Sequence, residues 1–360
     1  MVNKNLDEAK KRKNDEFYTQ YADIEREVLA YVEYDPDVFR GKTILLPCDD
    51  PEWSNFTLFF ANRFEEFGLK KLISTSYAPD AKKIQNKQPS LFELESEQYD
   101  PAKSNCKGKI FVLDHDITGD GKVTFDDLQW QYLDGDGDFR SDEVKRLRDE
   151  ADIIITNPPF SLFREFFGWL MEANKEFLII GNINAITYKE IFPHFKANEV
   201  WLGNGFQGGN AYFGVEMHRD FSDGVYNEKT GLVKFRNCCW FTNIDHGRRH
   251  QPLQLMTMAD NIKFKTDKSL IGLKEYRHYD NYDAIEVPAT KCIPSDYDGA
   301  MGVPVTFLDK YCPEQFEIIG ASESEGVGFS CGLWHSQSKI SQPAVDGVRK
   351  YKRLLIRKKR

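Results

Sequence analysis

Short, largely apolar segments alternate with segments of helical periodicity along the first 245 residues, and this alternation constrains the fold more than any other feature of the sequence. The candidate strands lie at residues 43–46, 72–75, 109–113, 152–156, 177–181, 200–202 and 239–242. Helical spacing of apolar side chains marks residues 24–34, 55–67, 141–150, 160–173 and 187–195. Runs that are apolar on both faces are typical of strands buried between two layers of helices. We therefore expect an α/β fold built on a doubly wound, mostly parallel, seven-stranded Rossmann-like sheet.

The alternation stops near Asp245, and this change marks the expected domain boundary. Residues 246–360 are rich in Tyr, Asp, Gly and Pro, which indicates a second, irregular α+β region. Within the first domain, residues 79–132 are polar and irregular around the single strand at 109–113, which predicts an insertion. We expect one domain at residues 1–245 and another at residues 246–360.

The basic residues are distributed unevenly along the chain. The formal net charge is −9, yet residues 349–360 contain eight basic residues and no acid. A cluster of this kind permits contacts to phosphate groups, although a solvated tail would have the same composition. The residues for which we take phosphate contact as a hypothesis are Arg349, Lys350, Lys352, Arg353, Arg357 and Lys358.

Targeting and redox features are few. No segment approaches the roughly 20 apolar residues needed to cross a bilayer. The polar, Lys-rich N-terminus lacks the apolar core of a secretion signal. The seven cysteines include no C-x-x-C pair, so the sequence predicts neither a disulfide framework nor a zinc knuckle. We therefore expect a cytoplasmic protein with reduced thiols and no membrane partner.

The motif Asn157-Pro158-Pro159-Phe160 carries the strongest chemical signal, because it directly follows the candidate strand at 152–156. Proline has no N–H and keeps the preceding residue extended. The Asn157 side-chain oxygen and a proline-flanked carbonyl then offer two acceptors to one amino group, and Phe160 offers a flat face to a planar ring. Because ligands bind at the carboxyl ends of strands in such sheets, we interpret the motif as a pocket for a planar amine such as an adenine edge. A simple strand-ending turn is the alternative.

Several segments, in the same order along nearly the whole chain, resemble the EcoRI-type adenine-specific DNA methyltransferases. They lie at residues 15–20 (DEFYTQ), 48–56, 135–141 (GDGDFRS), 156–165 (TNPPFSLFRE), 279–285 and 301–308 (MGVPVTFL). The resemblance implies a methyltransferase sheet and an enzyme that moves the methyl group of S-adenosylmethionine to the exocyclic amino group of a flipped adenine. It also implies double-stranded DNA as partner. We expect a monomer or weak dimer, and the sequence leaves open whether a cognate restriction endonuclease system accompanies the enzyme.

The resemblance further implies roles for individual residues. Those implied to hold the flipped adenine are Asn157, Pro158, Pro159 and Phe160. Those implied to contact the cofactor are Phe17, Tyr18 and Thr19 at its methionine end, Asp49, Asp50 and Ser54 after the first strand, and Asp138 and Phe139 beside an adenine ring. The basic residues near the C-terminus would contact DNA phosphates, and the region from 246 onward would recognise the target.

The chain departs from the family pattern at two places. Residues 51–54, Pro-Glu-Trp-Ser, replace the glycine-rich loop that commonly follows the first strand. Residues 74–77, Ser-Thr-Ser-Tyr, end the second strand without the acidic residue that usually binds the cofactor ribose. The sequence therefore does not identify the ribose-binding residue.

Two further patterns carry less weight. Residues 116–127 match a calcium-binding loop, but a polar turn in an acidic insertion explains them as well. Its candidate ligands are Asp116, Thr118, Asp120 and Asp127. The spacing Gly203-x-Gly205-x-x-Gly208 fits a dinucleotide fingerprint, yet no helical pattern follows it, so we reject that interpretation. The phenylalanines of residues 56–67 are expected in the core.

Other functions are compatible with parts of this pattern. RNA guanine-amino methyltransferases and glutamine-amide protein methyltransferases use similar Asn-Pro-Pro-aromatic motifs. A DNA-binding or calcium-binding module that kept the fold but lost the cofactor is a third alternative, because residues 51–54 alter the cofactor loop.

Overall fold

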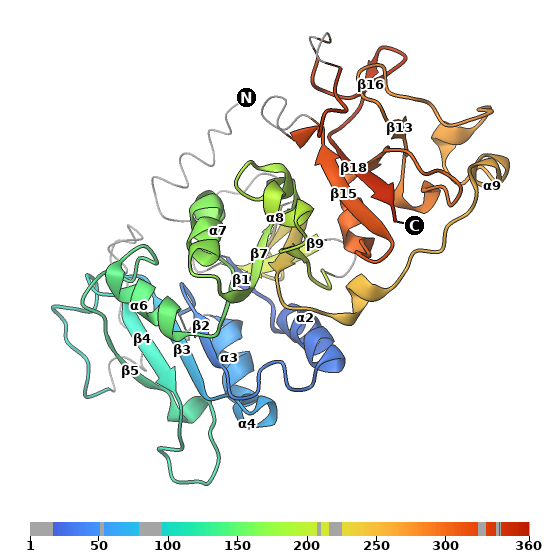
Figure 1. Ribbon diagram of the computed structural model, residues 1–360. Coiled ribbons are helices and arrows are strands. Elements are labelled where there is room, and N and C mark those ends of the chain that lie inside the picture. Colours follow the sequence, from blue (N-terminus) through green and yellow to red (C-terminus); the bar gives the residue numbers. More distant parts are fainter. Residues whose placement is uncertain are drawn as a thin grey trace. The chain divides into compact units, whose positions relative to one another are not determined.

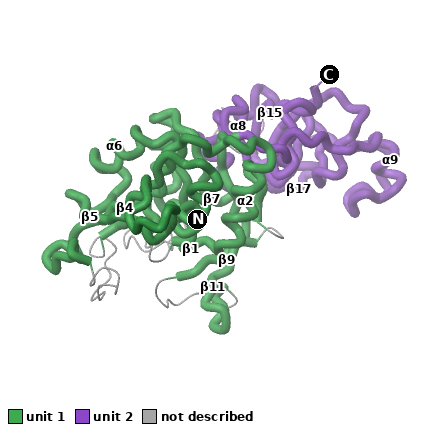
Figure 2. Tube along the Cα trace, turned by 90° about the horizontal axis from the view of Figure 1, so that it is seen from below, with its two compact units in different colours: residues 1–182, 203–244 green, residues 183–202, 245–360 purple. Residues whose placement is uncertain are grey.

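The structure of the protein is a computed structural model (Figure 1). It describes residues 17–50, 54–78, 96–206, 210–215, 225–322, 329–335, 338 and 340–359. The chain forms two compact units, Met1–Asn182 with Gly203–Ile244 and Ile183–Leu202 with Asp245–Arg360 (Figure 2). Residues 183–202 thus group with the second unit, although they precede the sequence boundary expected at 245. No helix in the described part of the chain is both long enough and apolar enough to cross a bilayer.

The largest sheet has eight strands. Their order is β5 (Gln129–Tyr132), β4 (Lys109–Leu113), β3 (Lys71–Ser76), β2 (Thr43–Leu46), β6 (Ile153–Thr156), β7 (Glu176–Asn182), β12 (Cys238–Thr242) and β8 (Trp201–Leu202). The central strands β3, β2, β6 and β7 are parallel to one another. Strands β4, β5 and β12 pair in the antiparallel sense. The α/β class is confirmed.

The expected seven-stranded, mostly parallel sheet is not confirmed, because the sheet has eight strands and mixed direction. The additional strand is β5, which pairs with β4 inside the segment that the sequence predicted as an insertion around one strand. Side chains of β5 alternate between exposed and more buried positions, since it lies at the edge of the sheet. An edge strand of this kind has no continuous apolar run for sequence periodicity to detect.

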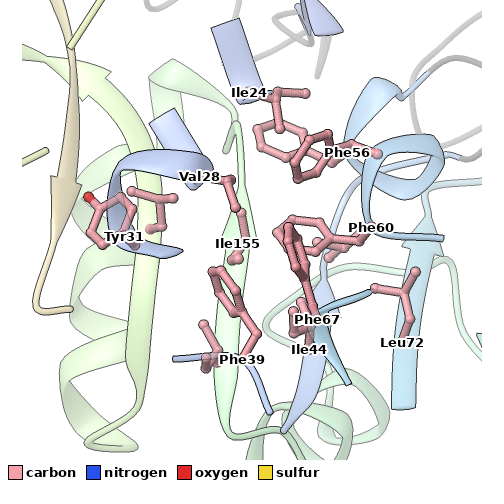
Figure 3. Packing of buried hydrophobic residues seen from close by; sticks show 14 of the residues in the cluster. Ile24, Val28, Tyr31, Phe39, Ile44, Phe56, Phe60, Phe67, Leu72 and Ile155 are labelled. Carbon is pink, nitrogen blue, oxygen red and sulfur yellow. The ribbon is translucent and has the colours of Figure 1, made fainter. Parts of the chain in front are cut away.

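Helices cover both faces of the sheet. They are α2 (Tyr21–Tyr34), α3 (Asn55–Asn62), α4 (Phe64–Phe67), α6 (Asp142–Glu150), the 3-10 turns η2 (Phe125–Asp127) and η3 (Phe160–Leu162), and α7 (Phe163–Glu172). Figure 3 shows Phe56, Phe60 and Phe67 packed with Ile44 and Leu72 of the strands. On the other face, Phe167 of α7 packs against Phe177 of β7, with ring centroids 6.0 Å apart. The phenylalanines of residues 56–67 are therefore core residues, as expected.

No single helix spans 187–195 as expected: the 3-10 turn η4 (Ile183–Thr187) ends where the segment begins, and the short helix α8 (Phe192–Lys196) starts only at its second half. Pro193 stands in the first turn of α8. Because proline lacks the N–H that a helix interior requires, it is tolerated where a helix begins and not further along.

A small antiparallel sheet adjoins this core. Its order is β1 (Tyr18–Thr19), β9 (Asn210–Gly214), β11 (Leu232–Arg236) and β10 (Tyr226–Asn227). Ala211, Phe213 and Val233 are fully buried on one face of it. The sheet thereby brings residues near the N-terminus and residues near 235 to the same place in the first unit.

The second unit contains a four-stranded sheet, a two-stranded hairpin and short helices. The sheet order is β13 (Ile285–Glu286), β14 (Met301–Pro304), β18 (Arg353–Lys358) and β15 (Phe316–Ala321), and the hairpin is β16 (Ala344–Val345) with β17 (Val348–Arg349). The helices are η6 (Gly247–His250), α9 (Met258–Lys263), η7 (Lys268–Leu270), η8 (Thr290–Cys292) and η9 (Val305–Lys310). The basic C-terminal segment is thus not a solvated tail, because β18 lies between β14 and β15.

Candidate active site

Asn157 follows the carboxyl end of β6 and is held in a fixed orientation. Its Nδ2 donates to the main-chain carbonyl of Phe17 at 2.5 Å. The residue is 8% exposed, and its Oδ1 is buried with no hydrogen-bond partner among the described residues. A buried acceptor without a donor costs about 1–3 kcal/mol. The arrangement therefore leaves one amide oxygen open to a donor that none of the described residues supplies.

The two prolines behave as their chemistry predicts. Pro158 and Pro159 are buried, and the carbonyl of Pro159 accepts from the Leu162 N–H at 2.9 Å at the start of η3. No described residue donates to the carbonyl of Pro158. A second acceptor thus lies one residue from Asn157.

Aromatic rings lie around Phe160. Its ring stacks on that of Phe17, with centroids 5.7 Å apart and planes inclined by 26°. Phe213 and Phe235 of the small sheet meet the ring of Phe160 edge-on, with ring centroids 6.1 and 5.5 Å from that of Phe160. The ring of Phe160 is only partly buried. The site thus combines unpaired oxygen acceptors with aromatic faces, which suits a planar amine.

Asp49 joins three elements behind this motif. Its carboxylate accepts from Ser54 Oγ at 2.8 Å and from Thr156 Oγ1 at 2.5 Å, and its main-chain carbonyl accepts from Ser74 Oγ. These contacts tie the loop after β2 to the ends of β6 and β3 and to the N-cap of α3. Both carboxylate oxygens of Asp49 are therefore used within the protein.

The backbone of this loop compensates for the missing glycine. Cys48 adopts the left-handed conformation, with φ of 67°. Such values are uncommon outside glycine and carry strain, and they accumulate at functional sites. Asp50 is buried beside it. Residues 51–53 lie outside the described part of the chain.

A second side-chain amide holds β1. Asn55, the first residue of α3, donates from Nδ2 to the carbonyl of Thr19 at 2.7 Å. Thr19 is buried, and its Oγ1 has no hydrogen-bond partner among the described residues. The sequence indicated Thr19 as a cofactor contact but gave Asn55 no role. Its only signal was its position directly after the N-cap residue Ser54.

The loop at 135–138 crosses the end of β3. Ala78 N–H donates to the carbonyl of Asp136 at 2.8 Å. Gly137 has φ of 84°, and a Cβ there would lie 2.3 Å from the Ser76 carbonyl oxygen, so only glycine allows this approach. The loop thus brings acidic residues to the end of the second core strand, where the sequence has none. Asp138 itself binds Arg140, Oδ2 to Nη2 at 2.6 Å.

The role implied for Phe139 beside an adenine is not supported. Its side chain is fully buried, with its ring 5.1 Å from Phe166 and 5.7 Å from Trp169 of α7. Phe139 is therefore a core residue that anchors the loop, because no face of its ring is open to a ligand.

Comparison with known proteins connects this geometry to a family. A family model described as "Adenine-specific methyltransferase EcoRI" matches residues 5–359. The chain belongs to this family. The Type II methyltransferase M.EcoRI of Escherichia coli is 40% identical over 362 residues, which cover 100% of this chain and 98% of that protein. No solved structure matches the chain.

Two further relatives come from mycoplasmas. The Type II methyltransferase M.MgeORF184P of Mycoplasma genitalium (strain ATCC 33530 / DSM 19775 / NCTC 10195 / G37) is 33% identical, covering 97% of each chain. M.MpnI of Mycoplasma pneumoniae (strain ATCC 29342 / M129 / Subtype 1), also a Type II methyltransferase, is 34% identical and covers 86% of this chain and 83% of that protein. The family resemblance of the sequence is confirmed. The protein is an adenine-specific DNA methyltransferase that takes its methyl group from S-adenosylmethionine.

The basic residues near the C-terminus of this methyltransferase have different surroundings. Arg353 is buried, and its Nη2 lies 2.7 Å from Glu286 Oε1. Its implied contact with DNA phosphate is therefore not supported, since its charge is neutralised inside the unit. Arg357 pairs with Glu317 at 3.2 Å on the surface. Lys358 donates to the carbonyl of Ser295.

Three basic residues lie outside β18. Lys352 Nζ donates to Thr187 Oγ1 at 3.0 Å. Arg349 and Lys350 form no ion pair with any residue that the structure describes. Within the described residues, these two members of the predicted group lie beside no carboxylate partner.

The calcium-like loop of the methyltransferase is closed by its own backbone. Asp127 is buried and accepts from Ile117 N–H and Thr118 N–H, both at 2.9 Å, and from Thr124 N–H at 2.8 Å. These hydrogen bonds, that from Thr118 foremost, lower the pKa of Asp127 far below its usual value. Asp116 likewise accepts from Gly121 N–H, at 2.8 Å. Asp120 accepts from Lys122 N–H at 2.9 Å. Among the described residues, no group of three acidic, His or Cys side chains is arranged to hold a metal ion.

A buried carboxylate occupies the glycine-rich loop after β8. Glu27 of α2 accepts from Asn204 N–H at 2.7 Å and from Gly205 N–H at 2.8 Å. Tyr31 OH donates to the same carboxylate at 3.0 Å, and burial followed by the charge of Glu27 raises the pKa of that hydroxyl. Gly203 leaves room for it, since a Cβ there would lie 2.0 Å from Glu27 Oε1. A phosphate cannot share this place with a carboxylate. The element that follows is the strand β9 and not the helix that a dinucleotide fingerprint requires, which agrees with the rejection of that interpretation.

Proposed function

We propose that this methyltransferase flips its target adenine out of duplex DNA and binds the N6 amino group between Asn157 Oδ1 and the Pro158 carbonyl, with the purine against Phe160. The observation that carries the proposal is the buried Oδ1 of Asn157, which has no hydrogen-bond partner in the described ranges and whose direction is set by the bond from Nδ2 to Phe17. An adenine N6 group has two hydrogens and therefore matches two acceptors. The target atom is inaccessible inside the stack, and extrusion costs a few kcal/mol.

The two acceptors also explain how the protein activates the amine. Hydrogen bonds from N6 to Oδ1 of Asn157 and to the Pro158 carbonyl draw the nitrogen lone pair out of conjugation with the ring. The N6 atom then forms its new bond to carbon while the bond from that carbon to sulfur breaks, and one N6 proton leaves to water. Catalysis depends on holding the amine in line with the methyl group, an effect of positioning.

The residues proposed to hold S-adenosylmethionine surround the loop after β2. The buried Oγ1 of Thr19, which lacks a partner among the described residues, supports a ligand contact on β1. Bound there, the sulfonium supplies a methyl group and leaves as a neutral thioether. Phe17 and Tyr18 would lie at its methionine end, and Asp50 and Ser54 would line the loop. Asp136 and Asp138 are our candidates for the ribose hydroxyls, because their loop supplies the acid that β3 lacks.

We further propose that the second unit recognises the DNA target, and that the modified sites are those of a cognate restriction endonuclease. The enzyme would act as a monomer or weak dimer. The relatives are named Type II methyltransferases, which supports the restriction setting.

The decisive experiment compares wild type with Asn157→Ala. Methyl transfer from radiolabelled S-adenosylmethionine is measured with duplex DNA, single-stranded RNA and bulk protein as acceptors. We expect transfer to adenine N6 in duplex DNA by the wild type and none by the variant. Calorimetry should give S-adenosylmethionine the same affinity for both proteins.

The control is Asn62→Ala, since Asn62 is exposed on α3 and makes no side-chain hydrogen bond to a described residue. Full activity of the Asn157→Ala variant would refute the catalytic assignment. Preference for RNA or protein would favour the other amino-group methyltransferases, and absence of cofactor binding in the wild type would favour a non-catalytic module.

A further inference from the structure

The hairpin of β16 and β17 has a rigid turn at its tip. Ala344 pairs with Arg349 and Val345 with Val348, and Asp346 and Gly347 connect the two strands (Figure 1). Both turn residues have positive φ, 50° and 74°, as two-residue hairpin turns of type I′ require. The carboxylate of Asp280 accepts from the N–H groups of both, at 3.0 and 2.8 Å.

Side chains from outside the hairpin hold its two ends. Asn281 Oδ1 accepts from Ala344 N–H at 3.1 Å. Gln342 Nε2 donates to the Lys350 carbonyl at 2.9 Å. Arg353 Nη1 donates to the Tyr351 carbonyl at 3.2 Å, so the buried arginine positions the residue after the hairpin. The segment from 344 to 351 is therefore fixed before it meets any partner.

This fixed segment exposes apolar and cationic side chains together. Val348 is 61% exposed and Tyr351 87% exposed, the largest value of any large hydrophobic residue in the described ranges. Arg349 and Lys350, between them in sequence, form no ion pair with a described residue. Asp346, the acid at the tip, is paired with Arg277. An exposed tyrosine on a rigid support is poorly explained by folding, because it buries almost nothing.

We propose that the segment 344–351 enters a groove of the duplex DNA, an inference that rests on the proposed function. Arg349 and Lys350 would then contact phosphates, and Val348 and Tyr351 would contact base edges. The major groove of B-DNA admits a two-stranded β-ribbon. The positive charges of Arg349 and Lys350, which pair with no acid among the described residues, complement the phosphate backbone, whereas the chain as a whole has a net charge of −9. Because the hairpin is preorganised, binding it costs little conformational entropy.

The experiment begins by locating the methylated site through sequencing of modified bases in DNA treated with the wild type. Binding is then measured by fluorescence anisotropy for a duplex carrying that site and for one with a single base pair changed. For Tyr351→Ala with Val348→Ala we expect about tenfold weaker binding to the correct duplex and little change for the other. Tyr351→Phe should retain most of the affinity, since it keeps the ring.

The basic residues give a different signature. The double variant Arg349→Ala with Lys350→Ala should weaken binding to both duplexes alike. The slope of log binding constant against log salt concentration should become shallower by about two, one for each lost phosphate contact. The matched control for the Tyr351 substitution is Phe264→Ala, which removes another exposed aromatic ring. Phe264 stands at the end of α9 and is 63% exposed. Thermal unfolding of all variants should match the wild type, because these side chains are exposed.

Failure of the hairpin proposal differs from failure of the proposed function. If the wild type methylates duplex DNA but the Tyr351 and Arg349 variants bind both duplexes as tightly as the wild type, the hairpin proposal is wrong. If the wild type does not methylate duplex DNA at all, the proposed function itself is wrong.

Discussion

The side-chain amide of Asn157 and the main-chain carbonyl of Phe17 are joined by a 2.5 Å hydrogen bond across 140 residues of sequence. A side-chain amide can rotate by half a turn with little change in shape. Without the hydrogen bond to Phe17, Asn157 would therefore present either Nδ2 or Oδ1 to a ligand. The bond to Phe17 selects one orientation and leaves Oδ1, which is buried and unpaired among the described residues, as the acceptor. The N-terminal segment thus sets the orientation of the Asn157 side-chain amide.

Asn157→Asp tests this relationship at constant side-chain size. The carboxylate cannot donate to the Phe17 carbonyl, so the two oxygens repel and the side chain rotates away. We expect kcat to fall by about 100-fold, equivalent to ~2.7 kcal/mol of lost transition-state stabilisation. Single-turnover methylation of duplex DNA measures it, and undiminished turnover would show that the Phe17 contact has no catalytic role.

Asn55→Ala should show that β1 needs its second anchor. Loss of the 2.7 Å bond to the Thr19 carbonyl frees β1, which directly follows Phe17. We expect about a fivefold decrease in kcat/KM, with KM for S-adenosylmethionine raised, because one hydrogen bond contributes about 1 kcal/mol. Asn62→Ala on the same helix is the control and should leave both constants unchanged. An unaffected KM in the Asn55 variant would contradict the role of Thr19 in cofactor binding.

Glu27→Ala should destabilise the first unit. Its carboxylate accepts from Asn204 N–H, Gly205 N–H and Tyr31 OH, and truncation removes this acceptor from all three donors. We expect the free energy of unfolding to fall by about 2–4 kcal/mol in urea titrations. Glu33→Ala, on the exposed side of the same helix, should change it by less than about 0.5 kcal/mol. If the two variants were equally stable, the conclusion that Glu27 anchors the loop after β8 would be wrong.

His250→Gln should change how stability depends on pH. Burial lowers the pKa of His250, but hydrogen bonds to Asp245 and Glu314, at 2.9 and 2.8 Å, outweigh it, so the net pKa is raised. A raised pKa means that the protonated form stabilises the fold fully below about pH 6.5, the unfolded value, and that this contribution is lost as pH rises through the folded pKa.

Urea titrations between pH 5 and 9 provide the measurement. The difference in unfolding free energy between wild type and His250→Gln should be largest at acid pH and should shrink toward alkaline pH. His335→Gln, at an exposed position, is the control and should leave the pH profile of the wild type unchanged. A difference that grows with pH would show that His250 is neutral in the folded state.

The sequence predicted the parts of the structure that depend on local patterns. The strands β2, β4, β6 and β7 are buried on both faces, so their continuous apolar runs identified them and the α/β class. The Asn157 motif could be placed at a carboxyl end because prolines and a strand stand next to each other in the chain. Edge strand β5 was missed, since its side chains alternate at the surface.

Tertiary structure alone decided which distant residues meet. Composition identified the C-terminal basic residues, but only strand pairing showed that Arg353 lies inside a sheet against Glu286 while Arg349 and Lys350 stay unpaired among the described residues. No local pattern brings Phe17 to Asn157, Asn55 to Thr19 or Asp136 to the end of β3. Periodicity records whether a side chain is buried and not which partner buries it, because hydrophobic burial is non-directional. Directional hydrogen bonds identify partners, and those between distant residues require the fold that brings the two groups together.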